Sequence, residues 1–291
     1  MDRVILIEKN NDKDIETAVY EREGRSILSL WGIKDNNLTS YSIMEGTSTI
    51  FRFCYRDLYE VYYGPIEKMK LQTLIIPSTV REIRNADLPL SISHVINYSP
   101  FFEVSNKTIY TRGKKELLRC YDFSNDGSFL ISNEVETIKR DAFCGCRFKT
   151  IIIGESVREI EGNPFMNMVH NSAMLEIVNH SLFIHDEWEG GIYNDNKELI
   201  AYVGNQEEYH VADGTISIKD FAFSGSKVNK IWLPSSIKGF NIEKYIPSNK
   251  LLFIIPDSLK YDYPIWNSQI VTESKYRISK SKRNIKYTGE F

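Results

Sequence analysis

The chain has no long hydrophobic run. In its 291 residues no apolar stretch approaches the roughly 18 residues that a transmembrane helix needs, so no transmembrane segment is expected. The N-terminus has only a short apolar run, Val4-Ile5-Leu6-Ile7, and does not have the pattern of a signal peptide. Two interpretations stay open: the protein is cytoplasmic as its sequence is written, or the sequence begins after a removed signal.

Charge of one sign is also lacking. The chain has 36 basic and 39 acidic residues and a formal net charge of −3, which argues against a nucleic-acid partner. Cysteine is scarce, with 4 residues, and the close pair Cys144-Gly145-Cys146 does not have the spacing of a zinc ribbon. No phosphate-binding loop or nucleophile motif is present. We therefore expect no metal, no cofactor and no enzymatic activity.

A spacing of 22 residues recurs along the chain. A turn precedes a small β-branched or aliphatic residue at seven places, and three of the six gaps between these places are 22 residues, while the others are 22 plus an insert. The repeat starts are Thr47, Val80, Val135, Val157, Thr215, Ile237 and Leu259. A fixed period of roughly 20 to 29 residues is typical of a leucine-rich-repeat solenoid.

Each repeat ends in a short run rich in Ile, Leu, Val and Phe, closed by proline or glycine. Such a run predicts a strand followed by a turn. In two of the copies, Ile151, Ile153, Ile231 and Leu233 take the inward positions of the strand, with a period of two. Because one repeat cannot bury its apolar side alone, we predict that these four residues share one hydrophobic spine.

The longer gaps carry a second repeated pattern. Residues 109–121 and 192–202 both have the order strand, polar turn, strand, and residues 19–30 form a looser third copy. Polar turn residues between alternating apolar runs are typical of a β-hairpin. We therefore expect an α+β or mainly β fold: a right-handed leucine-rich-repeat solenoid with short strands, irregular or short helical turns, and β-hairpin inserts.

The predicted organisation has three parts. They are an N-terminal hairpin or cap region at 1–40, repeats over 41–270 with hairpin inserts near 100–131 and 174–212, and a basic tail at 271–291.

The repeat resembles that of the BspA-like leucine-rich repeat family, the LRR_5 type. The family pattern includes Ile-x-x-x-Ala-Phe-x-x-Cys and a closing Ile-x-Ile strand; residues 135–154 and 215–234 carry it well, within a likeness that covers about residues 18–270. The resemblance implies a protein of bacterial type, found at the cell surface or secreted and implicated in adhesion. Many members of the family are uncharacterised.

In each predicted strand, the residue between the two inward positions points away from the core. Over successive repeats this position forms a largely apolar ladder: Ile75, Leu130, Ile152, His210, Trp232 and Ile254. An exposed apolar stripe on a curved sheet is typical of an interaction surface, so we predict that these residues bind a partner or a second copy of the chain. Two alternatives stay open, namely that the hairpin inserts cover the ladder and that strand propensity alone accounts for it.

These observations favour a non-catalytic recognition or adhesion protein that binds a protein or glycan through its sheet face. Two other functions stay open: a solenoid enzyme that acts on polysaccharide, and an intracellular scaffold. Acidic residues along one groove would favour the enzyme, whereas an open apolar ladder would favour recognition.

Overall fold

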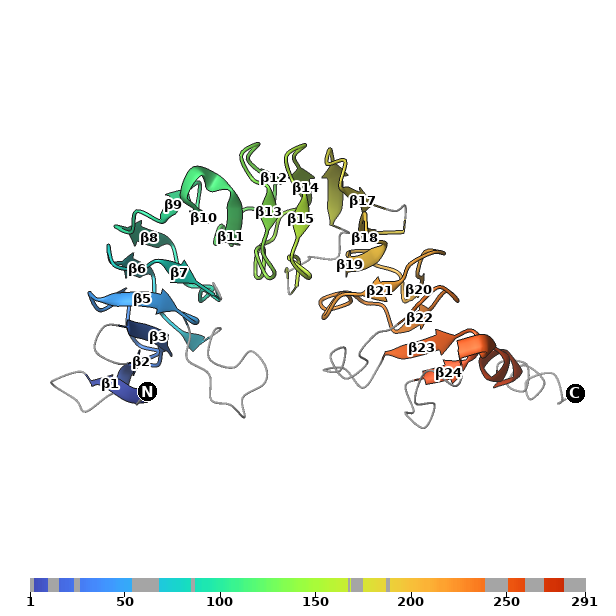
Figure 1. Cartoon of the computed structure of the whole chain (residues 1–291), viewed down its shortest axis with the longest axis horizontal. Coiled ribbons are helices and arrows are strands. Elements are labelled where there is room, and N and C mark those ends of the chain that lie inside the picture. Colours follow the sequence, from blue (N-terminus) through green and yellow to red (C-terminus); the bar gives the residue numbers. More distant parts are fainter. Residues whose placement is uncertain are drawn as a thin grey trace, which may run out of the picture.

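The computed structural model describes residues 3–9, 16–23, 27–53, 68–84, 87–166, 168, 175–186, 189–238, 251–259 and 270–279. Over these residues the chain winds into an elongated arch of about 9 solenoid turns (Figure 1). The structure is mostly β, and an α-helix covers residues 273–279. The predicted solenoid is therefore confirmed. Cys54 and residues 280–291 of the basic tail lie outside the described residues, and the predicted boundaries between the three parts stay a prediction.

The strands follow the same order three times, which divides the arch into three modules. Each module begins with a three-stranded antiparallel meander and continues with short parallel strands that alternate between two walls. In the third module, residues 239–250 lie outside the described part of the chain. The meanders of the second and third modules occupy the two longer gaps in which the sequence predicts hairpins.

The first module contains β1 (Arg3–Lys9), β2 (Glu16–Glu23), β3 (Ile27–Ile33), β4 (Ser40–Ser42), β5 (Thr47–Ile50), β6 (Thr73–Ile76), β7 (Glu82–Ile83) and β8 (His94–Asn97). The second contains β9 (Phe102–Ser105), β10 (Thr108–Thr111), the 3-10 turn η1 (Arg112–Lys114), β11 (Glu116–Cys120), β12 (Ser128–Leu130), β13 (Thr137–Ile138), β14 (Thr150–Ile153), β15 (Glu159–Ile160) and β16 (Glu176–Asn179). The third contains β17 (Ile184–Asp186), β18 (Gly191–Asn194), β19 (Glu198–Tyr202), β20 (Glu208–His210), β21 (Ser217–Ile218), β22 (Lys230–Trp232), β23 (Leu252–Ile255), the 3-10 turn η3 (Asp257–Leu259) and β24 (Ile270–Thr272).

Two walls of parallel strands enclose the core. The outer wall consists of three separate sheets with the strand orders β4-β6-β8, β12-β14-β16 and β20-β22-β23-β24. Within them the repeats stack in register: Ser128 pairs with Thr150, and Thr150 pairs with Glu176. The inner wall contains β5, β7, β13, β15 and β21. Figure 1 shows β12 and β14 on the convex side of the arch, with β13 and β15 beneath them.

The hairpin inserts extend the inner wall. β11 pairs in parallel with β13, with Glu116 opposite Thr137, and β19 pairs in the same way with β21, with Glu198 opposite Ser217. In the first module β3 continues into β5 by the same parallel pairing. The inserts are therefore additional rungs of the solenoid, and they do not fold over the outer wall as one of the two alternatives supposed.

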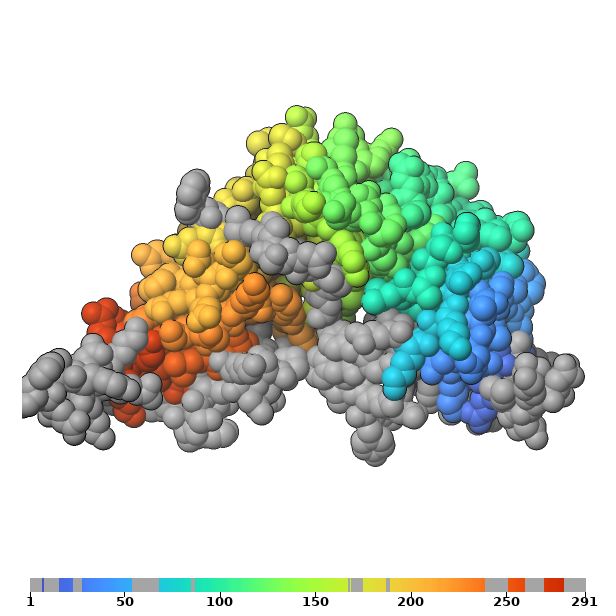
Figure 2. Space-filling model, turned by 180° about the vertical axis from the view of Figure 1, so that it is seen from behind, coloured from blue at the N-terminus to red at the C-terminus, as the bar shows by residue number. Residues whose placement is uncertain are grey.

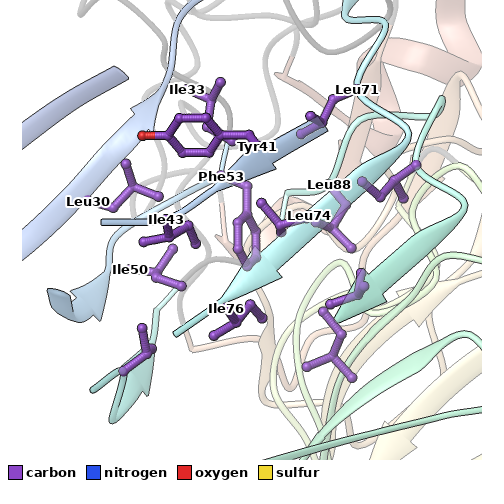
Figure 3. Packing of buried hydrophobic residues seen from close by; sticks show 14 of the residues in the cluster. Leu30, Ile33, Tyr41, Ile43, Ile50, Phe53, Leu71, Leu74, Ile76 and Leu88 are labelled. Carbon is purple, nitrogen blue, oxygen red and sulfur yellow. The ribbon is translucent and has the colours of Figure 1, made fainter. Parts of the chain in front are cut away.

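The core runs between the two walls as three clusters, and the first two of them also take in residues from the meander of the next module, such as Phe102 and Ile184. The predicted burial is confirmed, since Ile151, Ile153 and Ile231 are 0% exposed and Leu233 is 5% exposed. The four residues do not share one cluster, because Ile151 and Ile153 belong to the second and Ile231 and Leu233 to the third. In the first module the same inward positions surround Phe53, as Figure 3 shows for Leu74 and Ile76 of β6. Burial of these aliphatic side chains is the main source of stability, because each removes apolar area from water.

The two junctions between modules use one hydrogen-bonded turn, Asn-x-Ser-x-Phe. At the first junction the side-chain amide of Asn97 donates to the carbonyl of Phe102 over 2.9 Å, and its oxygen accepts from the backbone N–H of Ser99. At the second, Asn179 donates to the carbonyl of Ile184 over 2.6 Å and accepts from Ser181. These bonds turn the chain from the last outer strand of one module into the meander of the next.

Candidate functional site

The inner side of the arch contains a groove of ≈ 840 Å³. Its lining comes from all three modules, from Arg81 beside β7 to Asp220 beyond β21, although these residues are far apart in the sequence. Figure 2 shows the arch from behind, with the first and third modules at opposite ends. The lining residues are Arg81, Glu82, Ile83, Arg84, Phe102, Thr111, Glu116, Leu118, Lys139, Arg140, Asp141, Glu161, Gly162, Glu198, Ser217, Ile218, Lys219 and Asp220.

The inner strands place charged side chains along this groove. The inner strands β7, β13, β15 and β21 have two residues each, and the second is an isoleucine; Ile138 is 0% exposed and Ile160 is 3% exposed, so both point into the core. The next residue along the chain must then point to the opposite side. At that position successive repeats have Arg84, Lys139, Glu161 and Lys219, and all four line the groove.

Ion pairs join these side chains across the rungs. The Nζ atom of Lys139 lies 2.9 Å from a carboxylate oxygen of Glu116 and 2.7 Å from one of Glu161, so one lysine bridges β11 and the residue that follows β15. In the third module Lys219 lies 2.9 Å from Glu198. We call the five residues Glu116, Lys139, Glu161, Glu198 and Lys219 the inner charge ladder.

The pKa values of Lys139 and Glu198 favour the charged forms of these two side chains. Burial by itself lowers the pKa of Lys139, but the hydrogen bonds and charges of Glu161 and Glu116 outweigh burial, and the pKa is raised. Burial by itself raises the pKa of Glu198, but its hydrogen bonds to Lys219, Asn194 and Ser217 outweigh that effect, and the pKa is lowered. Both signs of charge are therefore present near neutral pH.

An aromatic stack lies at the end of the groove in the first module. The rings of Trp31 and Phe51 are stacked with centroids 4.9 Å apart, and the guanidinium of Arg84 lies 4.5 Å from the centroid of the Phe51 ring. The indole N–H of Trp31 donates to Glu21 over 2.9 Å. Since Phe51 follows the inner strand β5 as Lys139 follows β13, this stack continues the groove-facing position of the repeat.

The outer ladder predicted from the sequence lies on the opposite wall. Leu130 is 64% exposed, His210 is exposed, and Ile75, Ile152 and Trp232 are half-buried. The ladder is not continuous, because the outer wall is divided into three sheets where the hairpin inserts enter. Within the second module it continues from Leu130 through Ile152 to Val178.

The prediction that Ile254 is exposed is wrong. Its side chain is 1% exposed, between β22 and β24 in the outer sheet of the third module. The α-helix over residues 273–279 packs at this end: Tyr276 lies edge-on to Trp232 with ring centroids 5.4 Å apart. The indole N–H of Trp232 donates to Glu208 over 2.6 Å, and its ring stacks on His210 at 5.1 Å. The C-terminal end of the ladder is therefore a packed polar–aromatic cluster.

Side chains of the types that hold metal ions or act in catalysis are paired with neighbouring side chains, as the residues of the inner charge ladder are. Among the described residues no three His, Cys, Asp or Glu side chains are gathered in a geometry that could bind a metal. His185 lies 2.7 Å from Asp195. Hydrogen bonds from Ser132 and Lys115 lower the pKa values of Glu134 and Glu136, respectively. These carboxylates are bases in contact with donors, which is not the state of a general acid.

The inner charge ladder is not among the sites predicted from the sequence. Its signal is present in the repeat, because the residue one step after the inner isoleucine is charged in four copies. The detectable periodicity lies in the longer strands of the outer wall, since a two-residue strand has no periodicity of its own.

Among the described residues, no helix combines the length and the apolar character that a membrane span requires.

Comparison with known proteins identifies the repeat. The family model described as "BspA type Leucine rich repeat region" matches six copies, over residues 114–186 and 197–261. No curated protein matches the chain.

Several solved structures have a similar course of the chain. A leucine-rich cell surface protein from Faecalibacterium prausnitzii is 19% identical, with a TM-score of 0.46; the match covers 80% of this chain and 62% of that protein. A leucine-rich repeat protein from Eubacterium ventriosum is 13% identical, with a TM-score of 0.41 and coverage of 88% and 67%. The pneumococcal vaccine antigen PcpA is 14% identical, with a TM-score of 0.36 and coverage of 85% and 69%. Because these identities and TM-scores are low, the family assignment comes from the repeat match alone.

Proposed function

Because the repeats of this chain belong to the BspA-type leucine-rich repeat family, we propose that it is a non-catalytic recognition protein of the adhesion type, whose inner groove binds a polypeptide partner. The observation that carries the proposal is the inner charge ladder, which lines one concave surface with side chains from two modules. Concave solenoid surfaces are the usual binding surfaces of repeat proteins. We place this recognition at the cell surface, as the family resemblance implies.

Charge pattern favours a polypeptide over a glycan. Within each module lysine and glutamate alternate along the ladder, and such a surface is complementary to a chain that also has charges of both signs at regular intervals. A neutral glycan is bound largely through aromatic faces, and among the described residues that line the groove the one aromatic side chain, Phe102, is 6% exposed. The Phe51 ring near the groove is already covered by Trp31 and Arg84.

Acidic residues along a groove are the feature that favours a polysaccharide-active enzyme, and the described part of the groove lining contains six of them. Hydrolysis of a glycoside needs one carboxylic acid that holds its proton near neutral pH beside a second, ionised carboxylate. Glu116 and Glu161 share Lys139 as their partner, and Glu198 is held by Lys219. This pairing supports recognition, since each of these carboxylates is held by a lysine and the pKa of Glu198 is lowered.

The outer ladder is a second candidate surface, favoured by the 64% exposure of Leu130. We propose that Leu130 and Ile152, with Ile75, His210 and Trp232, add an apolar contact on the convex side, through a partner or a second copy of the chain. Leu130→Asp should then abolish this contact and leave far-UV circular dichroism unchanged, since the side chain is outside the core. A dimer or complex that survives the substitution would exclude the outer ladder.

The groove proposal is tested by panning a displayed peptide library on the immobilised chain. Peptides should be selected with acidic and basic residues at intervals, and their affinity should fall as salt concentration rises. Lys139→Gln combined with Lys219→Gln should weaken binding by about tenfold or more, because truncating one partner of a contacting charge pair is costly.

A matched control variant removes two lysine charges outside the groove. Lys107→Gln combined with Lys149→Gln breaks the ion pairs to Asp122 and Asp126, which do not line the groove. The control should bind the selected peptides as the unmodified chain does. Equal loss in both double variants would show a non-specific effect of net charge. Binding of a glycan array that depends on Lys139 and Lys219, without binding of any peptide, would contradict a polypeptide partner.

A further inference from the structure

Three cysteine thiols gather around a buried arginine in the second module. Cys120 ends β11, and Cys144 and Cys146 lie on the turn that follows β13. Cys120 and Cys146 are 0% exposed, and the thiol of Cys146 donates to the carbonyl of Cys120 over 3.6 Å. Cys144 is half-buried. All three are free thiols in the structure.

The arginine is Arg119, which precedes Cys120 and is 2% exposed. One of its guanidinium N–H groups donates to the carbonyl of Asp141, while its Nε–H has no hydrogen-bond partner among the described residues. A guanidinium in the interior is costly unless an anion lies close to it. Its position therefore favours a negative charge on the sulfur atoms beside it.

The equivalent turn of the third module provides an internal comparison. Cys120 and Tyr202 hold the same place, since their backbone N–H groups donate to Ala142 and Ala222, respectively. Aligned in this way, Arg119, Cys120, Cys144 and Cys146 are replaced by Ala201, Tyr202, Ser224 and Ser226. The arginine and the three thiols are thus all absent where the same backbone is built a second time. Because the third module builds the same turn without these four residues, the fold does not require them. Their joint presence in the second module indicates that they share a chemical role.

The pKa values of the two buried thiols shift in opposite directions. A side-chain hydrogen bond with Cys146 lowers the pKa of Cys120, and the charge of Arg119 acts in the same direction. The same side-chain interaction, together with burial, raises the pKa of Cys146. Of the two side chains, Cys120 is therefore the one that gives a thiolate more readily, with the thiol of Cys146 beside it.

We propose that Cys120 and Cys146 are an oxidation site that forms a disulfide when the protein meets hydrogen peroxide. The thiolate of Cys120 attacks one peroxide oxygen: an S–O bond forms, the O–O bond breaks, and the leaving hydroxide takes a proton to become water. The sulfur of Cys146 then attacks the sulfenic sulfur: the S–S bond forms, the S–O bond breaks, and a second water leaves with the proton of Cys146. Two thiols and one peroxide thus give one disulfide and two waters.

Burial selects the oxidant. Both sulfurs are 0% exposed, so a reagent as small as hydrogen peroxide is required, whereas a bulky disulfide would reach Cys144 first. The product joins the hairpin strand β11 to the turn of the next repeat. Leu118 of that strand and Asp141 of that turn both line the inner groove, so the bond would fix one side of the groove covalently.

The test uses the full chain with Cys54→Ser, so that only the three cysteines of this site are counted. The protein is treated with hydrogen peroxide, excess thiols are blocked with N-ethylmaleimide, and peptides are mapped by mass spectrometry without reduction. We expect the thiol count to fall from three to one, a Cys120–Cys146 cross-link, and full reversal by dithiothreitol.

Two variants separate this bond from its alternatives. Cys144→Ser should form the same cross-link, and Cys146→Ser, which copies the residue of the third module, should form none. Recovery of all three thiols after peroxide, of Cys120 as an unresolved sulfinic acid, or of a cross-link through Cys144 would overturn the proposal. The mapping of the Cys54→Ser chain alone is decisive if Cys146→Ser fails to fold.

Discussion

The second and third modules have the same backbone but fill it differently. The residue before the Ala-Phe pair of the repeat has a φ of 62° in both, at Asp141 and at Phe221. In the third module the interior beside this turn is aromatic: the rings of Tyr202 and Tyr209 lie 4.3 Å apart. In the second, the interior contains Cys120 and Arg119.

The first and third modules each have a pair of hydrogen-bonded tyrosines. The hydroxyl groups of Tyr20 and Tyr41 lie 2.6 Å apart, as those of Tyr193 and Tyr209 lie 2.5 Å apart. The second module has Phe129 at the equivalent place in β12. The comparison shows that the inward aliphatic residues and the strand pairings determine the frame, and that the polar groups within it vary from module to module. Four sets of substitutions test this division, from the largest expected effect to the smallest.

Truncation of the inward aliphatic residues should cause the largest loss in the free energy of unfolding. The loss should be the same in the second and third modules. Ile151→Ala and Ile231→Ala each leave a cavity at a 0% exposed position, so we expect a loss of about 2–5 kcal/mol in the free energy of unfolding. Urea denaturation followed by circular dichroism measures it. The control is Ile152→Ala, on the same strand but half-buried on the outer wall, which should cost less than half as much. Equal losses at Ile151 and Ile152 would contradict the assignment of the walls.

Loss of the junction turn should cost less. Asn179→Ala leaves the backbone N–H of Ser181 and the carbonyl of Ile184 without this partner, so we expect a loss of about 1–3 kcal/mol. Asn97→Ala should have an effect of the same size, because its hydrogen bonds are equivalent. Asn133→Ala, at an exposed position, is the control and should change the unfolding free energy by less than about 0.5 kcal/mol. Different effects at Asn97 and Asn179 would show that the junctions are not equivalent.

Removal of one hydroxyl from the tyrosine pair should have a smaller effect again. Tyr209→Phe copies the residue at position 129 and removes the 2.5 Å contact with Tyr193, which also accepts from the backbone N–H of Ala212. We expect a loss of about 1 kcal/mol by thermal or urea denaturation. No measurable loss would mean that the tyrosine pair, which the second module lacks, makes no contribution to the free energy of unfolding.

The ion pair of the inner charge ladder should make the smallest contribution, and it should depend on pH. The pKa of Glu198 is lowered in the folded chain, so its contribution is present above the unfolded pKa of about 4.3 and is lost as pH falls through the folded value. The Tm of the unmodified chain should therefore exceed that of Glu198→Gln at pH 6, and the gap should close as the pH falls below about 4. A gap that widens in acid would show that the sign of the shift is wrong.

The sequence predicts the frame well for a physical reason. Ile151, Ile153, Ile231 and Leu233 repeat because each stacks on the same position of the next rung, so register in the sequence becomes contact in space. The hairpins are predicted for a similar reason, since polar turn residues separate alternating strands. The sequence does not predict that the hairpins extend the inner wall, because the pairing of Glu116 with Thr137 arises only when the chain is folded.

The site is predicted less well. The outer position is correct for Leu130, but Ile254 is buried in the wall where the helix over 273–279 packs against Trp232, and nothing in the repeat encodes that packing. The charged position after the inner isoleucine repeats in the sequence, but the groove depends on curvature, which brings Arg81 and Asp220 to one surface and has no local signal. The cysteine cluster depends on contact between Cys120 and Cys146, which belong to different rungs.

Hydrogen–deuterium exchange of the chain with and without a selected peptide tests most directly which wall binds the partner. We expect slower exchange in residues 137–141, 159–162 and 217–220, which border the inner groove, with no change in residues 128–131, 150–153 and 230–232 of the outer wall. Protection confined to the outer-wall segments would contradict it.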